Sequence, residues 1–319
     1  MPFNRKVVYL LLYDCIIVGG GIAGLQAAVQ LGRSGRSALV IDAGNGRSAM
    51  CRRYRNVLGW PDGISGPELR KIGRQQAESY GARFVDDEAV SAGRNGDAFE
   101  VRGASRPDAA YRGSTLLLAT GLLDRMPDLP GLAPCLGLTV YVCPDCDGYE
   151  VQGRKTIVLG AGDVGANMAL ALSSRTRDIV YINHEYDHKP VTSELEIKLR
   201  ERGIEAVAQS IEAVSAEGDG QFAGVTLVDG AMITGERGFI AFGGNEVRTD
   251  LAVQLGVERM ENKHIVTDPR SKMTNVPRVW AAGDAGVHAE QVTIAMGEGA
   301  QAAIWINKTL TEAEAADRS

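Results

Sequence analysis

The stretch DCIIVGGGIAG, residues 14–24, decides the fold of this chain. Residues 14–18 form a short apolar run typical of a buried strand, and three glycines with the spacing GxGxxG follow it: Gly19, Gly21 and Gly24. Apolar residues at helical spacing come next, and a second apolar run over 38–41 ends at Asp42. Glycines at these positions let a pyrophosphate approach the N-terminus of the helix, and the acid can accept ribose hydroxyls. The sequence therefore predicts a βαβ unit that binds a dinucleotide.

A second unit with the same layout follows later in the chain. An apolar run over 156–159 leads into glycines at the same spacing, Gly160, Gly162 and Gly165, and a further apolar run covers 178–182. This duplication is the nearest approach to an internal repeat in the sequence. The chain is therefore predicted to have an α/β fold with two Rossmann-like dinucleotide-binding domains.

The segment CPDCDGYE, residues 143–150, lies between the two glycine motifs. Cys143 and Cys146 have the CxxC spacing of a redox-active disulfide, in which the surroundings favour the thiolate of one cysteine, and Asp147 follows at once. A structural zinc site needs four ligands, and the sequence has no second CxxC, so we predict no metal. A redox dithiol between two dinucleotide-binding units suggests that electrons move between a flavin and a thiol.

Composition narrows the class of protein. The chain has 319 residues, 45% hydrophobic and 23% charged, which suffices for two domains with cores of their own. Its net charge of -6 and the lack of a basic tract argue against nucleic acid as a partner. Five cysteines with one close pair suit a reducing, cytoplasmic location. We also expect a β-rich stretch over about 204–240, and a helix over about 293–310 followed by a frayed polar tail.

The N-terminal run VVYLLLY, residues 7–13, is too short for a membrane-spanning helix. Two interpretations stay open. The run forms an extra turn or strand ahead of the first buried strand, or it contacts a membrane surface or a partner.

Five motifs in order resemble those of the low-molecular-weight thioredoxin reductase family of two-domain flavoproteins. They are GGGIAG, LLLATG, CPDCDG, GAGDVG and VWAAGD, and the resemblance covers about residues 14–310. It implies a homodimer and an FAD-binding domain of residues 1–120 and 245–319. A nucleotide-binding domain of residues 121–244, inserted into this first domain, carries the CxxC.

The resemblance also implies a role for each matching residue. The glycines Gly19, Gly21 and Gly24 would hold the FAD pyrophosphate, and Asp42 the adenosine ribose. The other FAD positions are Asn56 in a loop beside the flavin, Gly121 at the end of LLLATG, Asp284 at the ribityl chain, and Gln291 with Val292 at the pyrimidine end of the ring.

For the dithiol, the resemblance implies that Cys146 lies nearer the flavin and that Cys143 exchanges with the substrate. Asp147 would pass protons to and from the dithiol. The substrate would be a thioredoxin-like protein or a small dithiol or disulfide.

The most informative departure from the family lies at residues 183–189, NHEYDHK. Members that use NADPH place an Arg-rich motif there, which grips the 2′-phosphate. This chain has Glu185 and Asp187 instead, which would repel a dianion, and only Lys189 or Arg175 could offset them from elsewhere. We therefore do not expect NADPH as the electron donor. The stretch 42–47 and the ending GYE look more like a side branch of the family that includes dithiol oxidases.

Three interpretations of the second site stay open. The site is vestigial, or it takes NADH, or Gly160, Gly162 and Gly165 hold a second FAD. In all three the protein is an FAD-dependent thiol/disulfide oxidoreductase. The alternatives are an ordinary NAD(P)H-dependent thioredoxin reductase and a non-enzymatic redox sensor that keeps FAD as a structural ligand.

Overall fold

The computed structural model describes residues 11–286 and 290–318, and the chain divides into two compact units. Unit 1 comprises residues 1–49, 66–123 and 247–319, and unit 2 comprises residues 50–65 and 124–246. The family resemblance implies that 50–65 belong to the FAD-binding domain, whereas the structure groups this segment with unit 2. Inside unit 2 the segment is held by an Arg52 hydrogen bond to the Pro134 carbonyl at 3.0 Å.

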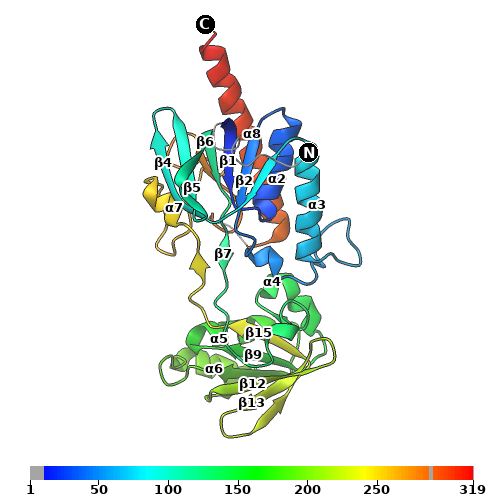
Figure 1. The fold of residues 1–319 in the computed structure, drawn as a ribbon. Coiled ribbons are helices and arrows are strands. Elements are labelled where there is room, and N and C mark those ends of the chain that lie inside the picture. Colours follow the sequence, from blue (N-terminus) through cyan, green and yellow to red (C-terminus); the bar gives the residue numbers. More distant parts are fainter. Residues whose placement is uncertain (1–10, 287–289, 319) are drawn as a thin grey trace. The chain divides into compact units, whose positions relative to one another are not determined.

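Unit 1 is built on a seven-stranded sheet in the order β3-β2-β1-β6-β5-β4, with β17 paired to β6. Strands β2, β1, β6, β5 and β4 of this sheet are labelled in Figure 1. The strands are β1 (Leu12–Val18), β2 (Ala38–Asp42), β3 (Arg83–Asp86), β4 (Ala89–Asn95), β5 (Ala98–Gly103), β6 (Arg106–Leu118) and β17 (Val279–Ala281). Strands β3, β2, β1, β6 and β17 are parallel to their neighbours, whereas β6, β5 and β4 form an antiparallel extension.

The helices of unit 1 are α2 (Ile22–Arg33), α3 (Gly66–Ser79), α7 (Asp250–Gln254) and α8 (Val292–Ala316), with a short 3-10 turn at Arg47–Ala49. Helix α2 packs against both α3 and α8. It does so because its buried stripe of small and aliphatic side chains recurs at helical spacing, including Ala27, Ala28 and Leu31.

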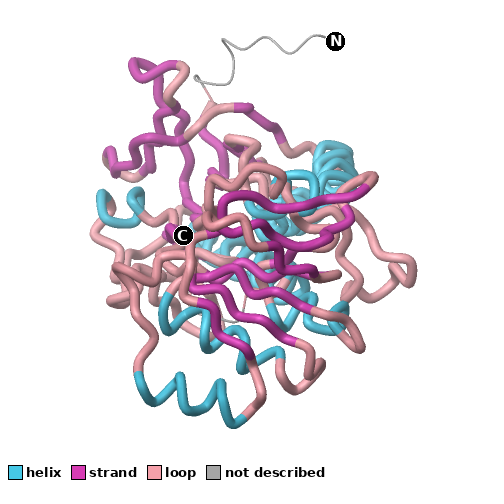
Figure 2. The backbone as a smooth tube through the Cα atoms, turned by 90° about the horizontal axis from the view of Figure 1, so that it is seen from below, coloured by secondary structure: helices cyan, strands magenta, loops and turns pink. Residues whose placement is uncertain are grey.

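Unit 2 holds a five-stranded parallel sheet in the order β11-β10-β9-β15-β8. Its elements are β8 (Val140–Tyr141), β9 (Thr156–Gly160), α5 (Gly162–Leu172), β10 (Ile179–Asn183), α6 (Ser193–Glu201), β11 (Glu205–Val207) and β15 (Arg237–Ala241). Figure 2 shows the chain from below, with magenta strands side by side and cyan helices next to them.

The smaller elements of unit 2 include an antiparallel sheet of β12 (Ile211–Glu217), β13 (Gln221–Leu227) and β14 (Met232–Thr234). Together with β11 and β15 this sheet confirms the expected β-rich stretch. The dithiol helix α4 (Pro144–Asp147) lies between 3-10 turns at Ala133–Cys135 and Gly148–Val151. Where the chain crosses between the units, β7 (Leu122–Leu123) and β16 (Glu246–Val247) pair as a two-stranded sheet.

The two βαβ units share one register. Val18 on β1 is opposite Ile41 on β2, and Leu159 on β9 is opposite Ile182 on β10. In each unit the first glycine of the motif therefore lies next to the C-terminal end of the second strand, β2 or β10. This confirms the predicted fold class of two Rossmann-like α/β domains.

The C-terminal helix differs from its expected length. It was expected to end near residue 310, but α8 continues to Ala316. Arg36 holds this extension, because its guanidinium donates to Asn307 and Thr311, both at 2.8 Å, and pairs with Glu314.

At the other end of the described chain, Leu12 belongs to β1, in line with the interpretation as strand for that part of 7–13. Residues 7–10 lie outside the described residues. The side chains of Leu11 and Leu12 are 36% and 57% exposed. Among the helices that the structure describes, none is long and apolar enough to cross a membrane.

Candidate active site

The first glycine motif forms a turn that only glycine can make. Gly19 has φ +109°, and a Cβ there would lie 2.2 Å from the Ala119 carbonyl oxygen. A Cβ on Gly24 would lie 1.9 Å from the Gly19 oxygen, so α2 can start only where this side chain is missing. By contrast, nothing lies within 4 Å of a Cβ built on Gly21, the residue before the helix. The space beside Gly21, at the N-terminus of α2, is thus open, as a pyrophosphate bound there would require.

Asp42 is held rigidly at the end of β2. One carboxylate oxygen accepts from the backbone amides of Gly20 and Gly44 at 3.1 and 3.2 Å, and the other pairs with Arg70 at 2.7 Å. A carboxylate offers about four lone-pair sites, so Asp42 can still accept a ribose hydroxyl. Arg70 lies on α3, and no local sequence signal linked it to the site.

The predicted FAD residues of unit 1 meet at one edge of its sheet. Gly19, Asp42, Gly121 and Asp284 follow or end the parallel strands β1, β2, β6 and β17, and carboxyl ends of parallel strands lie at the same edge. Gln291 caps α8, and Val292 is its first residue. These residues fit an FAD. Asn56, in contrast, lies in the segment 50–65 that groups with unit 2.

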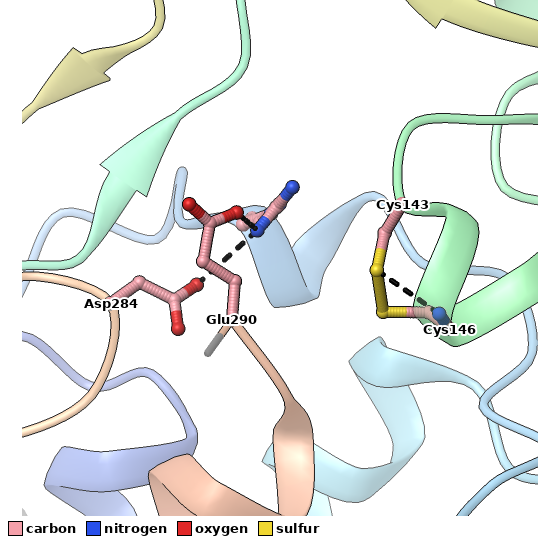
Figure 3. The surroundings of a disulfide bond; sticks show 5 residues. Cys143, Cys146, Asp284 and Glu290 are labelled. Carbon is pink, nitrogen blue, oxygen red and sulfur yellow. Dashed lines mark hydrogen bonds and ion pairs between the residues drawn. A yellow bond between two sulfur atoms is a disulfide. The ribbon is translucent and has the colours of Figure 1, made fainter. Parts of the chain in front are cut away.

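Asp284 belongs to a charge cluster that sequence reasoning missed. Arg47 pairs with Glu290 at 2.6 Å and with Asp284 at 3.6 Å (Figure 3). The cluster joins residues more than 200 positions apart in the chain, so neither Arg47 nor Glu290 could be assigned from local pattern.

The turn that carries Asp284 rests on a buried ion pair. Gly283, at φ +75°, donates its amide to Glu298 at 2.9 Å, and Glu298 pairs with Lys272 at 2.7 Å. Lys272 itself has a left-handed backbone, with φ +61°. Helix α8 thereby fixes the backbone immediately before Asp284.

The dithiol lies in unit 2 as a disulfide between Cys143 and Cys146 (Figure 3). Cys143 caps α4, and its sulfur accepts a hydrogen bond from the Cys146 amide at 3.1 Å. Both side chains are half-buried, and the Asp147 amide donates to the Cys143 carbonyl. An amide donor stabilises a thiolate more than a thiol, so after reduction this bond favours Cys143 as the nucleophile.

The other three cysteines lie in packed surroundings. Cys15 and Cys135 are buried and Cys51 is half-buried. Burial raises the pKa of the Cys15 thiol to about 12 and also raises the pKa of Cys135. In the part of the chain that the structure describes, no cluster of His, Cys, Asp and Glu could hold a metal ion.

At the second glycine motif, other residues occupy the space that is open beside the first motif. Gly162 has φ +49°, and a Cβ there would meet Lys189 atoms at 3.1 and 3.2 Å and the Pro190 oxygen at 3.4 Å. Asn183, the register counterpart of Asp42, is buried and uses its side chain internally. Its Oδ1 accepts from the Gly162 amide at 3.0 Å, and its Nδ2 donates to the Lys189 carbonyl at 2.8 Å. The glycines Gly160 and Gly165 serve close packing, against the Ala241 carbonyl and the Tyr181 ring.

Charges beside this motif are already paired. Glu185 binds Arg125 at 2.5 Å and Lys189 at 2.7 Å, and chiefly the hydrogen bond from Arg125 lowers the pKa of Glu185 to about 2. Burial lowers the pKa of His184, whose Nδ1 accepts the Ile211 amide at 2.8 Å. Lys189 is therefore engaged by Glu185, and Arg175 packs on Gly148 instead.

An α/β unit with an open glycine turn, joined to a second α/β unit that carries a CxxC disulfide, is the arrangement of a flavin-dependent disulfide oxidoreductase. The family model described as pyridine nucleotide-disulphide oxidoreductase matches residues 13–299. The chain belongs to this family, among its thioredoxin reductase-like flavoproteins. It is therefore an enzyme, and the redox-sensor alternative is set aside.

The chain is similar to proteins named thioredoxin reductase. That of Aquifex aeolicus is 29% identical over 94% of both chains, and that of Treponema pallidum is 30% identical over 91% of this chain and 95% of its own. Thioredoxin reductase tcpT of Claviceps purpurea is 30% identical over 90% of this chain and 91% of its own. The crystal structure of HlmI has a TM-score of 0.86 and 30% identity, covering 96% of this chain and 95% of HlmI.

Proposed function

We propose that this enzyme passes two electrons between the Cys143–Cys146 pair and FAD without NADPH, and that its second unit binds no dinucleotide. One observation carries the proposal: Lys189 and Pro190 lie over Gly162, where a pyrophosphate would have to approach. The paired Glu185 adds to it, because a 2′-phosphate would find Arg125 and Lys189 already neutralised. Of the three interpretations of the second site, these contacts favour the vestigial one.

The Cys143–Cys146 pair would react with its substrate by thiol–disulfide exchange. A substrate thiolate attacks the Cys143 sulfur, the Cys143–Cys146 bond breaks, and Cys146 leaves as a thiolate. The second substrate thiol then displaces Cys143, so the substrate leaves as a disulfide and the enzyme holds two thiols. Bound FAD supplies the acceptor for the two electrons when the enzyme disulfide re-forms. Asp147, beside Cys146 in sequence, takes the proton. A disulfide substrate would be reduced by the reverse exchange, with reduced flavin supplying the two electrons that restore the enzyme dithiol.

Residues of unit 1 would hold that cofactor. The α2 turn would carry the pyrophosphate, and Asp42 and Asp284 would bind the ribose and the ribityl chain. Gln291 and Val292, at the start of α8, would place positive helix-end amides near the ring.

Stopped-flow mixing tests the electron donor. Anaerobic protein is mixed with NADPH, with NADH or with a small dithiol, and flavin absorbance is followed. We expect bleaching by the dithiol and none above the buffer rate by either pyridine nucleotide. The Cys143→Ser variant should lose the dithiol reaction, which controls for direct reduction of the flavin. Rapid bleaching by NADPH would overturn the proposal.

The second candidate is an ordinary NAD(P)H-dependent thioredoxin reductase, which the names of the relatives favour. The same mixing experiment separates the two, since only that enzyme would couple NADPH oxidation to reduction of a thioredoxin. Homodimer formation, cytoplasmic location and any membrane contact through residues 7–13 stay predictions. Light scattering on the purified chain measures the first of them.

A further inference from the structure

The end of helix α5 forms a hollow beside residues 143–150 of unit 2, which we call the dithiol segment. The hollow has a volume of about 390 Å³ and is lined by Gly153, Ser173, Ser174, Arg175, Thr176 and Arg177. Gly148, two residues after Cys146, contacts one of these side chains. A Cβ built on Gly148 would lie 2.9 Å from Arg175 Nε and 3.0 Å from its Cζ. An arginine that lines the hollow thus also packs against the dithiol segment.

The hollow offers cationic donors that the protein does not use. Arg175 is half-buried and Arg177 exposed, and neither has an acidic partner in the part of the chain that the structure describes. Neighbouring Arg154, in contrast, pairs with Glu236 at 3.0 Å. The hydroxyls of Ser173 and Ser174 donate to helix carbonyls. The two guanidinium groups are therefore the side-chain donors open to a ligand, and their planar fork matches a carboxylate.

Nearby acids limit where an anion can bind. Asp145 and Asp178 are exposed, but neither lines the hollow. Asp145 and Asp147 flank Cys146 and would repel an anion at the sulfur atoms themselves. A carboxylate is accordingly favoured at the hollow and disfavoured at the reacting bond.

We infer that the hollow is a carboxylate subsite of the thiol-disulfide exchange. A substrate whose sulfur reacts at Cys143 would place a carboxylate against Arg175 and Arg177, one side chain away from the dithiol segment. The carboxylate belongs either to a small dithiol or to an acidic side chain of a thioredoxin-like protein. The inference rests on the proposed function, because it names a group on the substrate of that same dithiol.

A matched pair of small dithiols tests the subsite. Dihydrolipoate and dihydrolipoamide carry the same dithiol and differ in one charge. Each is mixed with oxidised protein, and new thiols at Cys143 and Cys146 are counted by acid quenching, alkylation and mass spectrometry. This readout follows exchange alone and needs no flavin or nicotinamide step. It therefore stays informative where the proposed electron path fails.

We expect wild type to react about fivefold faster with dihydrolipoate than with dihydrolipoamide at low salt, an effect in the range of an exposed ion pair. The Arg175→Gln and Arg177→Gln variants should each reduce this ratio, and the double variant should bring it to one. Arg202→Gln, which removes an exposed cation of unit 2 outside the hollow, should leave the ratio unchanged. Rates with dihydrolipoamide should be equal in all variants.

A parallel arm with reduced bacterial thioredoxin identifies the source of the carboxylate. If only the rate with thioredoxin falls in the double variant, the subsite binds an acidic side chain of a protein substrate. If the rate with dihydrolipoate falls, the subsite binds the carboxylate of a small substrate. The inference is wrong if neither rate responds to Arg175→Gln/Arg177→Gln, or if Arg202→Gln has the same effect.

Discussion

At the scale of single residues, Glu298 shows how a buried charge can serve a site that it does not touch. Its side chain is 9% exposed, and its two oxygens bind Lys272 and the Gly283 amide. Removing one partner of a buried ion pair leaves the other charge desolvated. Glu298 therefore stabilises both unit 1 and the turn that carries Asp284.

We expect Glu298→Ala to lower the free energy of unfolding by about 3 kcal/mol and to weaken FAD retention. Glu298→Gln should cost less, because the amide oxygen can still accept from Gly283, and adding Lys272→Met should recover part of the loss. Urea unfolding and FAD fluorescence on release measure both effects. Equal losses in the Ala and Gln variants would contradict this, because they would show that the hydrogen bond from Gly283 adds nothing beyond the charge.

The ion pairs of Glu185 should make the stability of the protein depend on pH. Its pKa is lowered to about 2 from an ordinary 4.5, so its ion pairs add stability above pH 4.5 and lose it as the pH falls toward 2. Wild type should therefore exceed Glu185→Gln in urea midpoint at pH 6, with the gap closing between about pH 4.5 and pH 2. A gap that stays constant over this range would contradict the assignment.

At the scale of elements, the last turns of α8 depend on a side chain from another part of the chain. The C-terminal stretch TEAEAADRS, residues 311–319, is polar and was expected to be frayed. Arg36, just beyond α2, reaches Asn307, Thr311 and Glu314 and extends the helix. A cation near a helix C-terminus also interacts favourably with the helix dipole.

We expect Arg36→Ala to speed amide hydrogen exchange in residues 311–316 about fivefold, as for loss of an exposed ion pair worth ~1 kcal/mol. Arg33→Ala is the matched control, since Arg33 contacts Tyr80 and not α8. Mass spectrometry of the C-terminal peptide gives the rates. Equal exchange rates in the two variants would mean that the last turns of α8 are stable without Arg36.

At the scale of the whole molecule, the two units share the register of their βαβ motifs but differ in what lies beside the glycine turn. The turn at Gly21 is open, whereas the turn at Gly162 lies under Lys189 and Pro190. Under the proposed function, the same strand, turn and helix would hold a dinucleotide in unit 1 and serve close packing in unit 2. The loop after the second strand, rather than the glycine spacing, would then make the difference.

Denatured protein should accordingly release one FAD per chain and no pyridine nucleotide. Gly21→Val should abolish FAD binding while the unit stays folded, because its side chain fills open space rather than meeting protein atoms. Chromatography of the released nucleotide and circular dichroism of the variant measure the two outcomes. Two FAD molecules per chain would favour the diflavin interpretation instead.

The sequence by itself determined the α/β fold, the two glycine turns and the CxxC, because each depends on residues close together in the chain. Gly19 and Gly24 belong to a turn that requires glycine at both positions. Cys143 and Cys146 are separated by only two residues, and Cys143 caps the short helix that contains Cys146. Only the tertiary structure decided the pairing of Arg125 with Glu185, the cluster of Arg47 with Asp284 and Glu290, and the contact of Arg175 with Gly148. These contacts join residues tens to hundreds of positions apart, so their energies depend on how the strands and helices pack, which no local pattern records.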